Sequence, residues 1–156
     1  FEPCSHIGEI LKKNLNNYKN IEIIQKALSN KNERAKLYLD IENYDGSSLF
    51  SKYFQTNNLH KDKYEIIDKI DANNFCKENK ILKIDILKID AEGSELDIIQ
   101  SLSKYIKNIS LIYLESHKKD EYIKIKEILK KKHLCTFNKS KKNELNESNF
   151  LLNKYV

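Results

Sequence analysis

Two pairs of polar residues are spaced so that each can share one face of a β-strand. Lys88 and Asp90 end an apolar, β-branched run, and Glu115 and His117 end another. Side chains two residues apart on a strand point to the same side. Histidine is the usual general base near neutral pH, and a neighbouring carboxylate can orient it or remove a proton itself. These four residues are therefore candidate catalytic groups.

Each pair also has a purely structural interpretation. A lysine inside a buried strand is costly unless paired, so the structural alternative for Lys88 and Asp90 is an ion pair, or a cap by Asp90 on the next helix. The structural alternative for His117 is an exposed loop residue. Glu92 and Glu95 fall in the first turn of that helix, where its dipole favours negative charge. We favour this structural role for Glu95 and leave Glu92 open; strand-end carboxylates can hold a divalent ion, but we assign no metal ligand.

The elements that must position these residues alternate between helical and strand patterns. Helices, with caps at Ser5 and at Ser94 paired with Asp97, are predicted at 5–18, 72–79, 94–106 and 120–132. Strands are predicted at 21–24, 35–39, 64–70, 84–90, 109–115, 134–138 and 150–155. Turns or irregular segments are predicted at 27–30, 45–48 and 51–63. This order predicts an α/β fold with a mainly parallel sheet, a central strand at 84–90 and an antiparallel edge.

The composition narrows the classes of function. The chain has 156 residues and a net charge of +5, but its lysines are interleaved with 23 acids, so no nucleic-acid partner is predicted. No apolar run approaches the roughly 20 residues that span a bilayer. Three cysteines without a C-x-x-C pair support neither a zinc site nor a disulfide framework. We therefore expect a protein of the reducing cytoplasm.

An acid near the start of the chain is a candidate ligand-binding group. Ligands of parallel α/β sheets bind beyond the carboxyl ends of the strands, where an acid can accept hydrogen bonds from ribose hydroxyls. Glu2 follows what we interpret as the last residue of a strand. Its alternative role is that of an ordinary acid near a helix start.

Five short motifs, in order, resemble those of the FkbM family of methyltransferases. The most specific, Lys88-Ile89-Asp90-Ala91-Glu92-Gly93-Ser94-Glu95, resembles the family's K-I-D-x-E-G-x-E signature. The others are Phe1-Glu2-Pro3, Ala27-Leu28-Ser29, Gly46-Ser47-Ser48-Leu49 and the E-x-H strand end at Glu115-Ser116-His117.

The resemblance implies a Rossmann-like class I fold and S-adenosylmethionine as cofactor. It implies that Glu2 and Pro3 hold the ribose, that Ala27 and Leu28 lie by the adenine, and that Asp90 lines the junction of cofactor and acceptor. It also implies that the first strand and the glycine-rich loop would precede Phe1. We therefore expect residues 1–156 to form a single partial methyltransferase domain.

The expected activity is O-methylation of a hydroxyl on a sugar, glycan or other small molecule. In this scheme Asp90 or His117 removes the hydroxyl proton, Glu115 orients His117, and Lys88 positions Asp90 or the acceptor. The alternative is a degenerate or truncated methyltransferase-like domain that serves as a non-catalytic binding module. Nucleic-acid binding through the lysines is the weaker third hypothesis.

Overall fold

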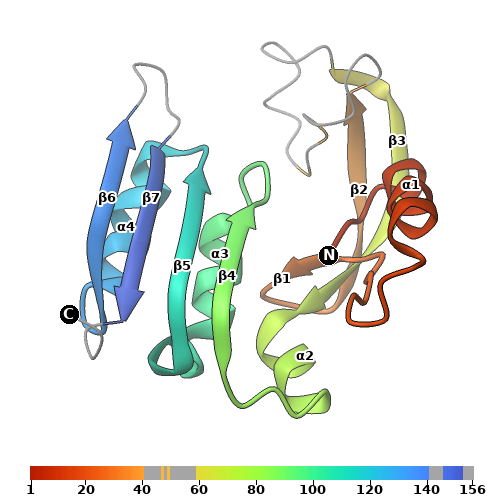
Figure 1. Cartoon of the computed structure of the whole chain (residues 1–156). Coiled ribbons are helices and arrows are strands. Elements are labelled where there is room, and N and C mark those ends of the chain that lie inside the picture. The colour runs from red at the N-terminus through yellow and green to blue at the C-terminus, as the bar shows by residue number, and fades with distance from the viewer. Residues whose placement is uncertain (41–46, 48, 50–58, 141–145, 153–156) are drawn as a thin grey trace. The chain divides into compact units, whose positions relative to one another are not determined.

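The computed structural model describes residues 1–40, 47, 49, 59–140 and 146–152. The chain divides into two compact units, residues 1–70 and 71–156, and each is described by itself (Figure 1). The expectation of a single partial methyltransferase domain stays a prediction.

The first unit is a helix and a three-stranded sheet. It contains α1 (Ser5–Leu15), β1 (Ala27–Ser29), β2 (Glu33–Asp40) and β3 (Leu59–Asp71), and the strand order is β1-β3-β2. β2 and β3 are antiparallel, with Leu37 opposite Glu65. A small core forms from buried residues that lie far apart in the sequence: Cys4, Ala27, Leu37 and Ile67.

The start of α1 differs from the prediction. Cys4 is the N-cap residue, and Ser5 is the first helical residue. The Ser5 backbone N–H donates to the Glu65 carboxylate at 2.8 Å, so a side chain from β3 caps the helix in place of a local hydroxyl. In α1 only Gly8 is buried, and Ile10 is 41% exposed.

Three other predictions fail in the first unit. Residues 21–24 are not a strand, because the Ile24 carbonyl accepts from the N–H groups of Glu2 and Lys26 and so takes no part in a ladder. Ala27–Ser29 is a short strand rather than a turn. β3 begins at Leu59, inside the segment that we expected to be irregular. The predicted loop at 45–48 lies outside the described residues except for Ser47.

The second unit follows the predicted order closely. Its elements are α2 (Ala72–Glu78), β4 (Ile84–Asp90), α3 (Glu95–Ser101), β5 (Ile109–Ser116), α4 (Lys119–Leu129), β6 (His133–Ser140) and β7 (Asn146–Leu152). Two short 3₁₀ turns, 102–104 and 106–108, connect α3 to β5. The existence of every element predicted here is confirmed, although β7 starts four residues earlier than expected.

The sheet of the second unit is mixed. Its strand order is β4-β5-β7-β6. Within the described residues, β4 and β5 are parallel, whereas β7 is antiparallel to both β5 and β6. The predicted antiparallel edge is therefore confirmed. Among the described strands, one of the three pairings is parallel and β4 stands at one end of the strand order, so a mainly parallel sheet with β4 at its centre stays a prediction.

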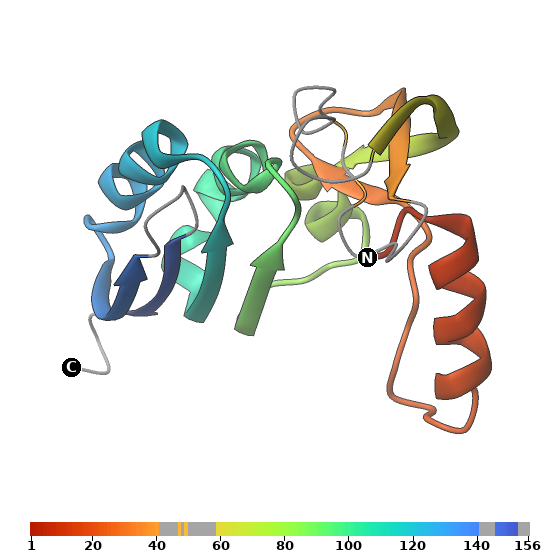
Figure 2. The same cartoon turned by 90° about the horizontal axis from the view of Figure 1, so that it is seen from above.

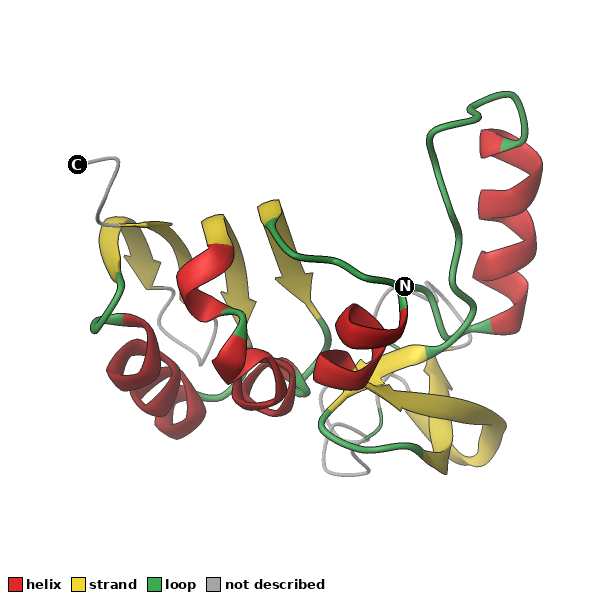
Figure 3. Cartoon of the chain, turned by 90° about the horizontal axis from the view of Figure 1, so that it is seen from below, coloured by secondary structure: helices red, strands yellow, loops and turns green. Residues whose placement is uncertain are grey.

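Two helices cover one face of this sheet. Figures 2 and 3 show α3 and α4 side by side on the same face. Each helix packs apolar side chains against the sheet, since Ile99 of α3 and Ile125 of α4 are fully buried, as is Ile112 of β5. Burial of each such side chain stabilises the fold by about 1.5–3 kcal/mol.

The opposite face of the sheet is exposed within the described residues. Ile86 and Lys88 of β4 alternate with the residues that face the helices, and Lys88 lies opposite Tyr113. The side chain of Lys88 is 72% exposed, so it is not the buried lysine that the sequence suggested. The same alternation and register place Asp90 directly opposite Glu115, where both strands end.

Candidate functional site

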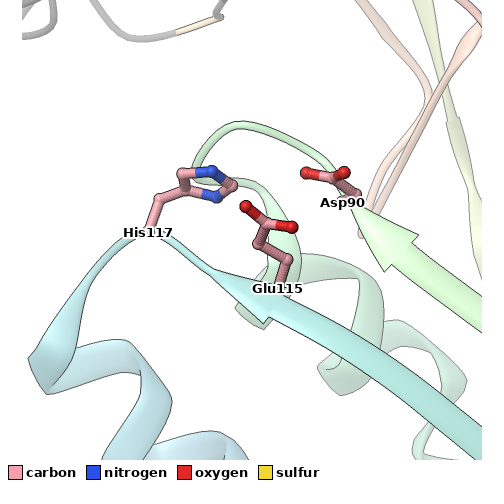
Figure 4. A group of neighbouring side chains, drawn as sticks. All are labelled: Asp90, Glu115 and His117. Carbon is pink, nitrogen blue, oxygen red and sulfur yellow. The ribbon is translucent and has the colours of Figure 1, made fainter. Parts of the chain in front are cut away.

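The ends of β4 and β5 bring three predicted residues together. Asp90 is the last residue of β4, Glu115 lies near the end of β5, and His117 follows that strand. One ligand atom from each of the three lies within 4.8 Å of the others. Figure 4 shows the two carboxylates and the imidazole gathered above the strand ends. Asp90 and His117 therefore lie at the same edge of this sheet.

A tight turn follows β4 and carries a fourth polar group. The Ser94 N–H donates to the Ala91 carbonyl at 3.1 Å, and Glu92 and Gly93 both have positive φ, 46° and 99°. Glycine adopts this conformation freely, but Glu92 does so at a cost of about 1–2 kcal/mol. The turn places Glu92 Oε1 3.4 Å from His117 Nε2.

Glu95 holds the other side of the imidazole. Its side chain is fully buried, and its Oε1 lies 3.0 Å from His117 Nδ1 and accepts from the Gly93 N–H at 2.8 Å. Glu95 therefore makes the hydrogen bond that holds the ring, and orientation of His117 by Glu115 stays a prediction. The predicted capping pair is wrong, since the Ser94 side chain makes no cap hydrogen bond.

The charges favour a protonated His117 beside an ionised Glu95. Burial lowers the pKa of His117, but the hydrogen bond to Glu95 and the charges of Glu92, Glu95 and Asp90 outweigh it and raise the pKa. Burial raises the pKa of Glu95, but the bonds to His117 and Gly93 outweigh it and lower the pKa. The pKa of Glu92 is raised, chiefly by burial.

The comparison with protein families bears on this site. The family model of the methyltransferase FkbM domain matches residues 1–139. The chain belongs to the FkbM methyltransferase domain family. Neither curated proteins nor solved structures give a match to it.

The FkbM match includes every candidate site residue. Glu2 and Pro3 are half-buried, and Glu2 Oε1 accepts from the Cys4 N–H at 2.8 Å. Burial raises the pKa of the Glu2 carboxyl. Ala27 packs in the core of the first unit, and Leu28 is half-buried beside it. The cofactor contacts expected of these four residues stay predictions.

Two lysines differ in how firmly they are held. Lys118 is 12% exposed and donates to the Gly93 carbonyl at 2.6 Å and to Glu121 at 2.9 Å, so it ties the turn after β4 to the start of α4. Lys88 lies 3.3 Å from Asp90, as predicted, but it is mostly exposed. An exposed pair of this kind contributes little stability.

Sequence reasoning missed the two residues that fix the site. Glu95 was interpreted as a helix-dipole residue, and Lys118 was not considered. The signal for Glu95 was present in the FkbM-like signature, where it lies three residues after Glu92.

None of the described helices has the length and hydrophobicity needed to cross a membrane.

Proposed function

We propose that this FkbM-family protein is an S-adenosylmethionine-dependent O-methyltransferase acting on a hydroxyl of a sugar, glycan or other small molecule. The observation that supports it best is the imidazole of His117, held by the buried Glu95 beside Asp90 at the carboxyl ends of two parallel strands. That edge is where ligands of such sheets bind.

The reaction is an in-line displacement at the methyl group. The acceptor oxygen forms a bond to the methyl carbon while the carbon–sulfur bond breaks. The electron pair of the broken carbon–sulfur bond stays on sulfur and gives S-adenosylhomocysteine. The hydroxyl proton passes to Asp90 or to neutral His117. Alignment of the two reactants supplies about 7–11 kcal/mol of the reduction in barrier.

The cofactor contacts belong to this proposal as well. Glu2 holds the ribose hydroxyls through its carboxylate, with Pro3 beside it, and Ala27 and Leu28 lie by the adenine. Asp90 lines the junction with the acceptor, and Lys88 positions Asp90. A ribose contact is equal in the ground and transition states, so Glu2→Ala should raise the KM for the cofactor more than it lowers kcat.

The test measures binding and transfer separately. Calorimetric titration with S-adenosylmethionine and S-adenosylhomocysteine reports binding, and release of S-adenosylhomocysteine with a panel of sugar and small-molecule hydroxyls reports transfer. Asp90→Asn and His117→Ala should each lower kcat by about 10²–10⁴-fold if the residue acts as base. Glu127→Gln, an exposed change on α4, is the matched control. Cofactor binding with no transfer to any acceptor would favour the non-catalytic binding module instead.

A further inference from the structure

We propose that Asp90, Glu115 and His117 bind one divalent metal ion of the Mn²⁺ type at the carboxyl ends of β4 and β5. The inference deepens the proposed methyl transfer by naming what makes the acceptor hydroxyl acidic. Only this catalytic role of the ion rests on the proposed methyltransferase function. Binding of the ion itself follows from the side chains.

The three donor atoms lie close to the separations that a metal ion requires. Bonds of about 2.0–2.2 Å place neighbouring ligand atoms of one ion roughly 3–3.4 Å apart and opposite ones roughly 4 Å apart. The donor atoms of Asp90, Glu115 and His117 are all within 4.8 Å of one another. Asp90 is 34% exposed on its side chain and Glu115 is half-buried, so small rotations of these carboxylates close the remaining difference.

The partner of His117 is a second, independent observation. Metal-binding histidines almost always donate their other ring N–H to a carboxylate or carbonyl, which fixes the ring and its tautomer. Glu95, fully buried, lies 3.0 Å from Nδ1 of His117, so Nε2 is the ring atom that would bind the ion, in place of its contact with Glu92 Oε1 at 3.4 Å. The second oxygen of Glu95 is buried and has no hydrogen-bond partner among the described residues.

The negative charge around His117 also favours binding of a cation. Asp90 and Glu115 are directly opposite on neighbouring strands, an arrangement that like charges disfavour. Glu92 and Glu95 add two more carboxylates around the same imidazole. Of the nearby lysines, Lys88 lies 3.3 Å from Asp90 but is mostly exposed, and Lys118 is engaged by Gly93 and Glu121. One divalent ion held by Asp90 and Glu115 would reduce the repulsion that these lysines and His117 leave.

The donor set also selects the kind of ion. Carboxylate oxygens suit Mg²⁺ and Mn²⁺, whereas imidazole suits the transition metals, so a mixed set of two oxygens and one nitrogen fits Mn²⁺. Three protein ligands leave coordination positions open for the acceptor hydroxyl, whose acidity the ion increases. With Asp90 and His117 engaged as ligands, Glu92 is a carboxylate outside the set that can take the released proton.

The experiment titrates metal-free protein with MnCl₂ by calorimetry and by the loss of the free Mn²⁺ electron paramagnetic resonance signal. The whole 156-residue chain is used, without cofactor or acceptor. We expect one ion per chain. Glu115→Gln and His117→Gln should each weaken binding at least tenfold, because each removes a ligand while keeping the side-chain size. Asp85→Asn is the matched control, since Asp85 is an exposed carboxylate at the other end of β4 and pairs with Lys83.

The outcomes separate this inference from the proposed function. Retained far-ultraviolet circular dichroism in the variants shows that a loss of binding is local. The inference is overturned if no stoichiometric binding occurs, or if Asp85→Asn weakens binding as much as Glu115→Gln. Methyl transfer that persists in excess chelator would leave the methyltransferase proposal standing and remove the ion from it. Site-specific Mn²⁺ binding by a protein that binds no S-adenosylmethionine would support the metal site and contradict the methyltransferase proposal.

Discussion

Replacement of Glu95 tests whether the buried pair with His117 stabilises the second unit. Glu95→Gln keeps the size of the side chain and an oxygen that can accept from the Gly93 N–H, but it removes the charge. A hydrogen bond to a charged group contributes about 1.5–3 kcal/mol, against about 0.5–1.5 kcal/mol for a neutral one. The new amide N–H is also buried where Glu95 Oε2 has no partner among the described residues. Together these effects should lower the free energy of unfolding by about 2–4 kcal/mol.

The pH dependence separates the charge from the packing. The pKa of His117 is raised above its ordinary 6.5, so its contribution is complete below 6.5 and is lost as pH rises through the folded value. The pKa of Glu95 is lowered from 4.5, so its contribution is complete above 4.5 and is lost as pH falls through the folded value. The pair therefore stabilises most between pH 4.5 and 6.5.

The assay is urea unfolding followed by circular dichroism, with a chelator present so that no ion contributes. The difference between wild type and Glu95→Gln should be largest at about pH 5.5 and smaller at about pH 9. Glu127→Gln, whose side chain is 61% exposed, should change stability by less than about 0.5 kcal/mol at either pH. An equal difference at both pH values would refute the charge-based account of the pair.

Three further outcomes are expected. Gly93→Ala should cost about 1–2 kcal/mol in urea unfolding, because φ at this position is 99°. His133 is buried, and its Nε2 N–H donates to the Ile109 carbonyl at 2.8 Å. Burial lowers the pKa of His133, so the wild-type protein should lose stability relative to His133→Gln as pH falls below 6.5. The same urea-unfolding assay measures this difference. Ile99→Ala should cost about 2–5 kcal/mol in thermal unfolding, whereas Ile86→Ala, at a site 63% exposed, should cost under about 1 kcal/mol.

The sequence predicted the second unit well because its periodic segments are strongly patterned. The β-branched run at Ile84–Asp90 and the apolar side that includes Ile125 each match one regular element. The first unit was predicted less well, because its segments obtain partners from distant parts of the chain. Glu65 of β3 caps α1, and the Ile24 carbonyl is used by Glu2, contacts that no local pattern encodes.

The same limit explains why the site was predicted in part. Asp90 and Glu115 could be paired from sequence, since both end apolar runs and parallel neighbours end at one edge. The role of Glu95 could not, because a glutamate in the first helical turn has the same local signature whether it faces solvent or the protein interior. Only the packing of α3 on the sheet decides that the Glu95 side chain is 0% exposed.

Once Glu95 is buried, the remaining features of the site have a common cause. A buried carboxylate is stable only with charged or hydrogen-bonded partners, and the positive φ values of Glu92 and Gly93 turn the Gly93 N–H toward it. The parallel register then brings His117 within hydrogen-bond distance, with Nε2 directed away from Glu95. The strained turn at Glu92 is therefore a requirement of the arrangement that holds the imidazole beside Asp90. A substitution that relaxes the turn but releases the Gly93 N–H should loosen His117 even where it leaves every candidate catalytic residue in place.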